Sequence, residues 1–381
     1  MGRRQKLVAT ALLSSLVVLS GAWLVQSQTG TSPRTTTYYI AADVLAWDYA
    51  PTGINQITGE AFDQLANTWV GSGPDRIGKV YKKALYREYT DSTFTSLKPR
   101  PPEWEHLGFL GPLLRAEVGD TIRVVFKNNA TFPASVHPHG VFYDKNSEGA
   151  PSADDAPGAD KADDAVPPGG AHTYVWPVPE RAGPAEGDLN SILWMYHSHT
   201  VEDRDVNAGL MGPMIVSARG TTKPDGTPEG VDRELVVSFH EVDENLSWYL
   251  EDNIQAYTGE PESVNREDIF FWTPFGGSNL MESMNGLIYG NLAGLTMVEG
   301  ERVRWYLMAS TNFEIHAPHW HGNTVVANRM RTDVTSLLPM GMMVAEMIPD
   351  NPGTWLFHCH VSVHLIAGMQ AHYRVLPKEG A

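Results

Sequence analysis

Residues 358–369 read HCHVSVHLIAGM, and this stretch decides how the whole chain is interpreted. It places the only cysteine of the chain, Cys359, between two histidines, with His364 and Met369 at fixed distances behind it. A thiolate, two imidazoles and a weak axial thioether form the ligand set of a trigonal blue copper site. Cys359, His364 and Met369 therefore supply three of the four ligands that such a site needs, and the second imidazole must come from elsewhere.

Histidine pairs with one residue between them recur along the chain. With 14 histidines in 381 residues, about half such a pair is expected by chance. The chain has four pairs: His137/His139 in HPHG, His197/His199 in WMYHSH, His319/His321 in HAPHWHG and His358/His360 in HCH. On a strand, residues i and i+2 lie on one face, so each pair presents two imidazoles side by side. Eight imidazoles in four pairs predict a polynuclear metal site.

The same alternation separates two metals within the HCH string. On an extended segment Cys359 points away from His358 and His360, so one metal lies behind another. The backbone of this tripeptide then serves as an electron relay between them. The alternative is a set of structural histidines and an inert buried thiol, which suits an isolated histidine but not this array.

The strings HPHG, HSH, HxxHxH and HCHxxxHxxxxM resemble those of multicopper oxidases over nearly the whole mature chain. Stretches such as KVYKKALYREYTDSTF and MNGLIYGNLAGLTM are similar to the ceruloplasmin branch, while the two-domain length is similar to bacterial small laccases. The resemblance implies four coppers per chain. A type 1 copper would be bound by His316, Cys359, His364 and Met369, and a type 2 copper by His137 and His319. The type 3 pair would take His139, His197, His199, His321, His358 and His360.

Short Val- and Thr-rich runs separated by Gly and Pro, such as TIRVVFKN, TYVWPVP and ELVVSFH, predict strands rather than helices. A chain of 381 residues is long enough for two domains with ample cores. The expected fold class is all-β, with two tandem cupredoxin domains, each a plastocyanin-like Greek-key β-sandwich.

An internal repeat supports two similar domains, because residues 113–140 align with 295–322 and residues 195–216 with 356–375. The type 1 ligand positions of the second copy are filled differently in the first, where Ala134, Ser198 and Leu210 replace a histidine, the cysteine and the methionine. The first domain therefore lacks a type 1 copper. It keeps both of its histidine pairs and can give four ligands to a shared cluster.

Because the eight cluster histidines are divided evenly between the domains, the two halves must meet at an interface. The resemblance implies head-to-tail domain packing and a homotrimer, with the cluster between the first domain of one subunit and the second domain of the next. A cluster formed within one chain is the alternative.

The expected boundaries follow composition. Residues 221–231 lie in a Gly-, Pro- and Thr-rich stretch and form the linker between domain 1 (31–220) and domain 2 (232–381). Residues 1–30 form a signal peptide or an N-terminal anchor, because Arg3, Arg4 and Lys6 precede an apolar stretch from 7 to 25. The protein is therefore expected to be exported, and to be periplasmic, secreted or anchored at the outer face of a membrane.

Cysteine content and charge exclude other classes. One cysteine rules out an intramolecular disulfide framework. A net charge of −17 argues against nucleic acid as a partner and is compatible with cationic substrates. The acidic stretch 144–170 is expected to be a solvated loop.

Several residues outside the copper strings are candidates for further roles. Tyr143 and Glu148 follow HPHG at the spacing seen in small laccases and are candidate proton donors for oxygen reduction, with a packed tyrosine and a solvated carboxylate as the alternative. The Met-rich run LLPMGMMVAEM is expected to fill core gaps rather than bind cuprous ion. The histidines outside the strings are expected to be structural or on the surface: His106, His172, His240 and His372.

The expected function is that of a multicopper oxidase. It takes single electrons from a phenolic compound or a metal ion such as Fe(II), and reduces O2 to water at the trinuclear cluster. Cys359, His358 and His360 would carry the electrons between the sites. Two alternatives come from other classes. A copper nitrite reductase has its type 1 copper in the first domain, where this chain has Ser198. A non-catalytic cupredoxin module would not require the complete set of copper ligands, which this chain has.

Overall fold

The structure is a computed structural model that describes residues 32–154, 156–270, 272–310 and 314–378. The chain divides into two compact units, residues 1–32 and 33–381, and the fold below is that of the second unit. The expected signal or anchor, residues 1–30, lies outside the described residues. Among the helices of the described ranges, none is long and apolar enough to cross a membrane.

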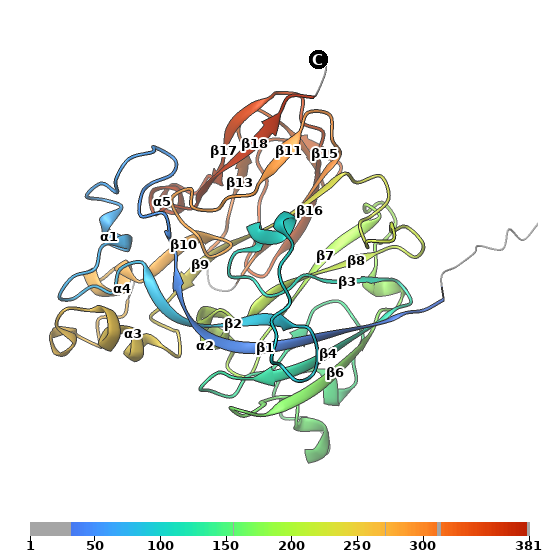
Figure 1. Cartoon of the computed structure of the whole chain (residues 1–381), viewed down its shortest axis with the longest axis horizontal. Helices are drawn as coiled ribbons and strands as arrows, with labels where there is room; N and C mark the ends of the chain where they lie inside the picture. The colour runs from blue at the N-terminus through green and yellow to red at the C-terminus, as the bar shows by residue number, and fades with distance from the viewer. Residues whose placement is uncertain (1–31, 155, 271, 311–313, 379–381) are drawn as a thin grey trace, which may run out of the picture. The chain divides into compact units, whose positions relative to one another are not determined.

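Strands dominate the described chain and form four sheets (Figure 1). The first two sheets use β1 (Thr35–Asp48), β2 (Val80–Tyr89), β3 (Leu114–Glu117), β4 (Thr121–Asn128), β5 (His137–Pro138), β6 (Ala171–Pro177), β7 (Ser191–His197) and β8 (Met211–Ser217). The other two use β9 (Arg233–Asp243), β10 (Leu280–Met284), β11 (Thr296–Val298), β12 (Val303–Ala309), β13 (Pro318–Trp320), β14 (Val325–Ala327), β15 (Met330–Thr332), β16 (Met342–Met347), β17 (Gly353–Cys359) and β18 (Gln370–Leu376). The run TIRVVFKN is β4, as predicted.

The two halves of the chain repeat one topology. The N-terminal sheets have the strand orders β2-β1-β4-β6 and β3-β8-β7-β5. The C-terminal sheets have the orders β10-β9-β12-β16, extended by β14 and β15, and β11-β18-β17-β13. In both copies the first strand pairs in parallel with the third long strand of its sheet, β1 with β4 and β9 with β12. The internal repeat seen in the sequence is therefore a repeat of the fold, and the predicted linker, 221–231, lies between β8 and β9.

Each pair of sheets closes over its own core, and a third apolar cluster joins the pairs. Strand β12 shows how one strand serves two cores, because every residue in it is buried. Trp305 and Leu307 pack in the C-terminal core. Tyr306 and Met308 point the other way and pack in a cluster that includes Leu193 of β7. We call this shared cluster the seam; it makes the two sandwiches one compact unit.

Helices are short and connect the strands. They are α1 (Asn67–Val70), α2 (Glu202–Ala208), α3 (Leu250–Tyr257), α4 (Pro274–Ser278) and α5 (Ser362–Ile366), with 3-10 turns η1 (Pro102–Leu107), η2 (Lys145–Ser147), η3 (Gly158–Lys161), η4 (Glu180–Ala182) and η5 (Pro261–Ser263). Helix α2 ends at Gly209, whose φ of 116° is accessible to glycine and turns the chain into β8. Helices α2 and α5 occupy matching places, each following a histidine pair at the end of β7 or β17.

Candidate copper sites

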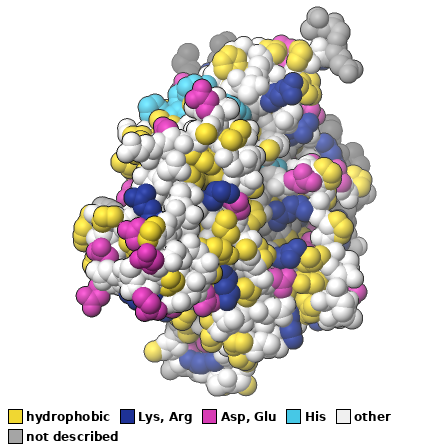
Figure 2. Space-filling model, turned by 60° about the vertical axis from the view of Figure 1, so that its left-hand side comes forward, with side chains coloured by type: hydrophobic (Ala, Val, Ile, Leu, Met, Phe, Trp, Pro, Cys, Tyr) yellow, Lys and Arg dark blue, Asp and Glu magenta, His cyan; other side chains and the backbone are white. Residues whose placement is uncertain are grey.

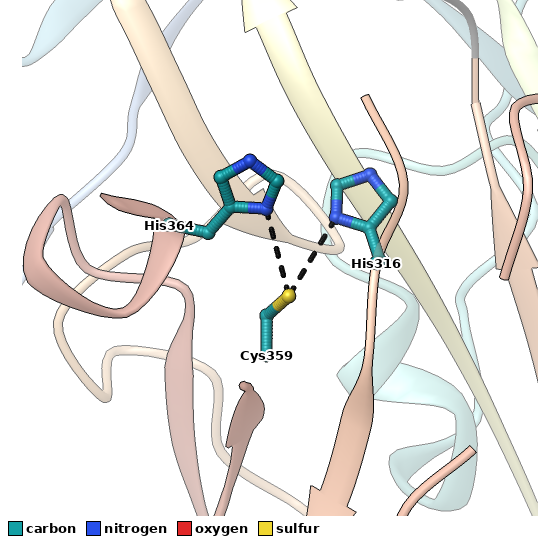
Figure 3. A group of neighbouring side chains, drawn as sticks. All are labelled: His316, Cys359 and His364. Atoms are coloured by element: carbon teal, nitrogen blue, oxygen red, sulfur yellow. Dashed lines mark hydrogen bonds between the residues drawn. The ribbon is translucent and has the colours of Figure 1, made fainter. Parts of the chain in front are cut away.

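The structure brings the expected type 1 residues together in the C-terminal core (Figure 3). The Nδ1 atom of His364 lies 3.5 Å from Cys359 Sγ, and the Nδ1 atom of His316 lies 3.9 Å from the same sulfur. Cys359 ends β17, and His364 lies in α5, the short helix that follows this strand. His316, the imidazole that the HCH string could not supply, comes from the segment before β13.

Met369 lies beside these residues. It is fully buried in the same core cluster as Cys359. Its backbone is bonded to both of its expected fellow ligands: Cys359 N donates to Met369 O at 3.1 Å, and Met369 N donates to His364 O at 2.9 Å. The thiol sulfur accepts a bond from Ala317 N at 3.3 Å, a contact that favours a sulfur carrying negative charge.

The cluster histidines form two groups because of strand register. In the N-terminal sandwich β5 pairs with β7, which sets His137 opposite His197. In the C-terminal sandwich β13 pairs with β17, which sets His319 opposite His358. Each group is completed by the second histidine of each string. We call these groups the N-terminal quartet (His137, His139, His197 and His199) and the C-terminal quartet (His319, His321, His358 and His360).

Ring nitrogens face one another within each quartet. In the N-terminal quartet His139 Nε2 and His197 Nε2 are 3.1 Å apart. In the C-terminal quartet His358 Nε2 lies 3.1 Å from His321 Nε2 and 3.3 Å from His319 Nδ1. His358 Nδ1 is bonded to the Cys359 carbonyl at 2.7 Å, so the opposite nitrogen is the one that faces the quartet.

No ring contact or hydrogen bond among the described residues joins a histidine of one quartet to a histidine of the other. Both quartets reach solvent: the side chain of His199 is 36% exposed, and His360 is exposed. Histidine side chains gather in one group near the upper edge of the face drawn in Figure 2, with an acidic side chain beside them. The described part of the chain thus contains two separate groups of four histidines.

The electrostatics suit metal ligands. Burial lowers the pKa of His316 to about 3 and of His139 to about 4, in each case helped by neighbouring histidines. Burial likewise lowers the pKa of His197 and of His358. These imidazoles are neutral at pH 7 and keep a lone pair for a metal. One soft thiol with two imidazoles, and four imidazoles in each quartet, are donor sets that fit copper.

An acidic group next to His364 was not identified from the sequence. Glu241 of β9 and Glu282 of β10 face each other across the antiparallel pair, and ligand atoms of both lie within 4.8 Å of one another and of a ring nitrogen of His364. His364 Nε2 lies 3.6 Å from Glu314 Oε2 and 3.9 Å from Glu282 Oε1. Burial, followed by repulsion from Glu241, raises the pKa of Glu282 well above its usual range. Glu241 and Glu282 meet only through the register of β9 and β10, and the sequence alone does not show this register.

Tyr143 and Glu148 lie beside the N-terminal quartet in different ways. The Tyr143 ring packs 5.7 Å from the His137 ring, and burial raises the pKa of its hydroxyl. Glu148 contacts His137 through its backbone carbonyl, 2.6 Å from Nδ1, while its carboxylate pairs with Lys145 at 2.5 Å. Among the described residues, the carboxylate that pairs with this quartet is instead that of Glu202, whose Oε2 lies 3.4 Å from His199 Nε2. The proton-donor roles of Tyr143 and Glu148 stay predictions.

Some of the remaining candidate residues have structural contacts. His106 is buried and accepts a bond from Val236 N at 3.1 Å across the seam. His240 is fully buried as well, packing 5.8 Å from the Phe109 ring. In the Met-rich run, Met340 and Met342 pack against the seam. Part of the acidic stretch 144–170 is packed rather than solvated, since Asp163 is buried and accepts a bond from Gly149 N at 2.7 Å.

Comparison with known proteins identifies the class. Two family models, both described as multicopper oxidase, match residues 107–221 and 262–379. Two solved structures, a multicopper oxidase and the multicopper oxidase mgLAC, align over 90% and 92% of this chain with TM-scores of 0.53 and 0.55. Their sequence identities of 19% and 18% show the fold alone. The chain belongs to the multicopper oxidase family, and the predicted all-β fold of two cupredoxin sandwiches is confirmed.

Relatives with higher sequence identity belong to the ceruloplasmin branch, as the strings predicted. The chain is 47% identical to human "Ferroxidase HEPHL1" over 90% of its own length, 42% identical to mouse hephaestin over 96%, and 39% identical to human ceruloplasmin over 94%. It spans only 29%, 31% and 33% of those proteins. The resemblance is therefore to about a third of each relative.

Proposed function

We propose that this protein is an exported oxidase that takes electrons one at a time from ferrous ion and passes them to O2. When bound, coppers would supply the redox chemistry: a type 1 copper at His316, Cys359, His364 and Met369, and three more coppers at the two quartets. The observation that carries the choice of ferrous ion is the position of Glu241, Glu282 and Glu314 around the outer edge of His364.

These carboxylates form a site for a divalent cation. Among the described residues, the ion pairs of Glu282 and Glu314 are with His364 alone. Glu282 is nearly buried, and its Oε2 atom has no hydrogen-bond partner. Glu241 is half-buried beside it, and two adjacent carboxylates repel each other unless a proton or a cation lies between them. Oxygen ligands suit Fe(II) and Mn(II), whereas Cu(I) prefers sulfur.

The proposed electron path leads from the carboxylates through His364 and Cys359 to His358. His364 turns its Nε2 edge to the carboxylates and its Nδ1 edge to Cys359 Sγ. From Cys359 the peptide backbone leads directly to His358, whose ring faces the C-terminal quartet. A single imidazole thus separates the cation position from the thiol, and one peptide bond separates the thiol residue from the quartet.

We further propose a homotrimer in which the N-terminal quartet of one subunit faces the C-terminal quartet of the next. Support comes from the separation of the quartets within one chain and from the exposure of His199 and His360. Three coppers need ligands from both quartets, so each subunit is incomplete alone. A head-to-tail contact that closes on itself satisfies every quartet. A fully copper-loaded, active monomer in a solution mass measurement would contradict this assembly.

Substrate choice is tested by oxygen uptake with Fe(II), Mn(II), Cu(I) and a dimethoxyphenol, comparing kcat/KM for wild type and the Glu241→Gln, Glu282→Gln double variant. We expect the double variant to lose at least about tenfold in kcat/KM for Fe(II) and to keep its rate with the phenol. The matched control is Glu260→Gln, which changes an exposed carboxylate of the C-terminal half. A wild type that prefers the phenol, or an equal loss for both substrates, would remove ferrous ion as the substrate.

Export is proposed from the N-terminal sequence, where Arg3, Arg4 and Lys6 precede an apolar stretch. Periplasmic, secreted and outer-face anchored forms all fit that sequence. Cell fractionation of the full chain with an antibody against the folded domains distinguishes them, and cytoplasmic retention would contradict export.

A further inference from the structure

The N-terminal sandwich keeps the backbone frame of a type 1 site although it lacks the ligands. Ser198 N donates to Leu210 O at 3.0 Å, and Leu210 N donates to Asp205 O at 3.1 Å. Asp205 lies in α2, five residues before Leu210.

The C-terminal sandwich has the same two bonds among its expected copper ligands. They run from Cys359 N to Met369 O at 3.1 Å and from Met369 N to His364 O at 2.9 Å. His364 stands five residues before Met369, as Asp205 does before its own partner. Asp205 therefore occupies the place that His364 has in the second copy.

The hydroxyl of Ser198 occupies the place of the thiol. Ser198 Oγ accepts a bond from Ser135 N at 3.0 Å, where Cys359 Sγ accepts one from Ala317 N at 3.3 Å. Ser198 Oγ in turn donates to Asp205 Oδ2 at 2.6 Å. A buried hydrogen bond has thus replaced a potential metal site.

The carboxylate of Asp205 has further donors around it. Val201 N donates to Oδ2 at 3.0 Å, and Trp248 Nε1 donates to Oδ1 at 2.8 Å. Asp205 and Ser198 are fully buried. A buried carboxylate is stabilised by several donors at once, and losing one of them leaves a costly unsatisfied group.

Trp248 belongs to the other half of the chain, between β9 and α3. Its ring stacks on Phe132 with centroids 5.2 Å apart and an angle of 16°, and the Arg204 guanidinium lies 3.9 Å from its centroid. The next residue, Tyr249, is buried within the N-terminal core cluster. A segment from the C-terminal half is therefore inserted beside the former type 1 position.

We propose that Asp205 is a positioning residue for the N-terminal quartet. Its carboxylate fixes Ser198, and with it His197 and His199 on either side, while it also holds Trp248. The C-terminal half of the chain thereby sets the geometry of a quartet to which it gives no ligand. This inference rests on the proposed copper assignment of His197 and His199. Groups that orient ligands in this way typically change metal affinity about 10–100-fold.

The test is copper titration of the full chain carrying Asp205→Asn. Asparagine keeps the shape of the side chain but replaces one carboxylate oxygen with an amide NH2 group. In either orientation of the amide, this NH2 group faces a group that now donates to Asp205. We expect copper affinity at the trinuclear positions to fall at least about tenfold. The thiolate-to-copper absorption of the type 1 site, in the other sandwich, stays unchanged.

A second variant and a control make the result specific. Trp248→Phe keeps an aromatic ring at this position and removes the indole N–H together with part of the ring volume, so the same loss of copper affinity is expected on a smaller scale. Asp203→Asn makes the same change at an exposed position of the same helix, and full copper loading is expected.

Three outcomes overturn the inference. One is full loading of Asp205→Asn beside a fully loaded wild type, which leaves the proposed function intact. Another is a parallel loss of type 1 and trinuclear copper together with a lower Tm of the copper-free protein, because that would show a role in folding alone. The third is a wild type that takes up no copper, which removes the proposed function as well.

Discussion

The two sandwiches share one topology and one backbone frame but differ in what fills the pocket behind the histidine pair. In the C-terminal copy, Cys359 faces two imidazoles in a buried apolar core. In the N-terminal copy, Ser198 faces the carboxylate of Asp205. The same fold thus supports a donor set that fits a soft metal ion in one copy and a closed hydrogen-bonded network in the other.

This difference shows which features each task requires. Both copies keep the strand register that pairs histidines, and the proposed shared cluster would need both quartets. Only the copy next to Glu241 and Glu282 has the thiol, so the proposed electron entry would be confined to one place per chain. The other pocket is free to hold Trp248 and join the two halves.

The largest effect is expected when the C-terminal copy is converted toward the N-terminal one with Cys359→Ser. The blue thiolate-to-copper absorption disappears, because no thiolate remains to bind the metal. Oxidation of Fe(II) is expected to fall by more than about a thousandfold, since the proposed electron entry goes through this site. Absorption spectra and oxygen uptake measure both. The trinuclear copper content is the internal reference, and we expect it to stay high because Ser198 shows that serine fits between two such histidines.

The seam that joins the copies gives the second prediction. Lys83 and Glu244 form a fully buried ion pair across it; Tyr49 also donates to Glu244 at 2.6 Å, and Lys83 donates to Asn207 O at 2.8 Å. Glu244→Gln leaves a buried ammonium without its counter-charge, so the free energy of unfolding should fall by about 3–5 kcal/mol. Urea denaturation of the copper-free protein measures this loss.

Its control is the same substitution in a surface pair. Glu88→Gln breaks the bond to Lys98, whose side chain is 53% exposed, and should cost less than about 1 kcal/mol. Equal losses of unfolding free energy in the two variants would show that the buried pair stabilises the seam no more than a surface pair does.

The third prediction concerns acid stability at the seam. His106 Nε2 accepts a bond from Val236 N, so the ring must be neutral, and burial lowers its pKa to about 4. In the unfolded chain the pKa of His106 is near 6.5. Between about pH 6.5 and pH 4 its imidazole therefore binds a proton in the unfolded chain but stays neutral in the folded chain. The contribution of neutral His106 to the free energy of unfolding is therefore complete above about pH 6.5. The free energy of unfolding falls by about 3 kcal/mol as the pH is lowered toward 4.

Urea unfolding of copper-free protein at pH 7, 5 and 4 checks this against His106→Gln. The variant should lose about 3 kcal/mol less than wild type over that range, because the other histidines titrate in both proteins. Identical pH profiles would mean that His106 does not titrate as its burial requires.

The sequence predicts those features of the site that depend on residue spacing within one strand. The alternation of HCH and HPHG, and the repeat, predicted both quartets and the lack of a type 1 site in the first domain. It missed Glu241 and Glu282 because they meet only through strand register. It missed Asp205 because the chain from the second histidine is longer by two residues in the first copy, 205 minus 199 against 364 minus 360.

The smallest effect is expected from Met369→Leu, which gives the C-terminal copy the residue found at Leu210. The change conserves volume in a buried position, so it should cost less than about 1.5 kcal/mol of stability. Blue absorption persists, because the thiolate and both imidazoles remain. The reduction potential rises, since an electron-donating axial thioether is replaced by an inert side chain. Redox titration of the absorption band measures this, with Met347→Leu, the same change elsewhere in the C-terminal core, as control. An unchanged potential would show that Met369 packs beside the site without acting as its axial ligand.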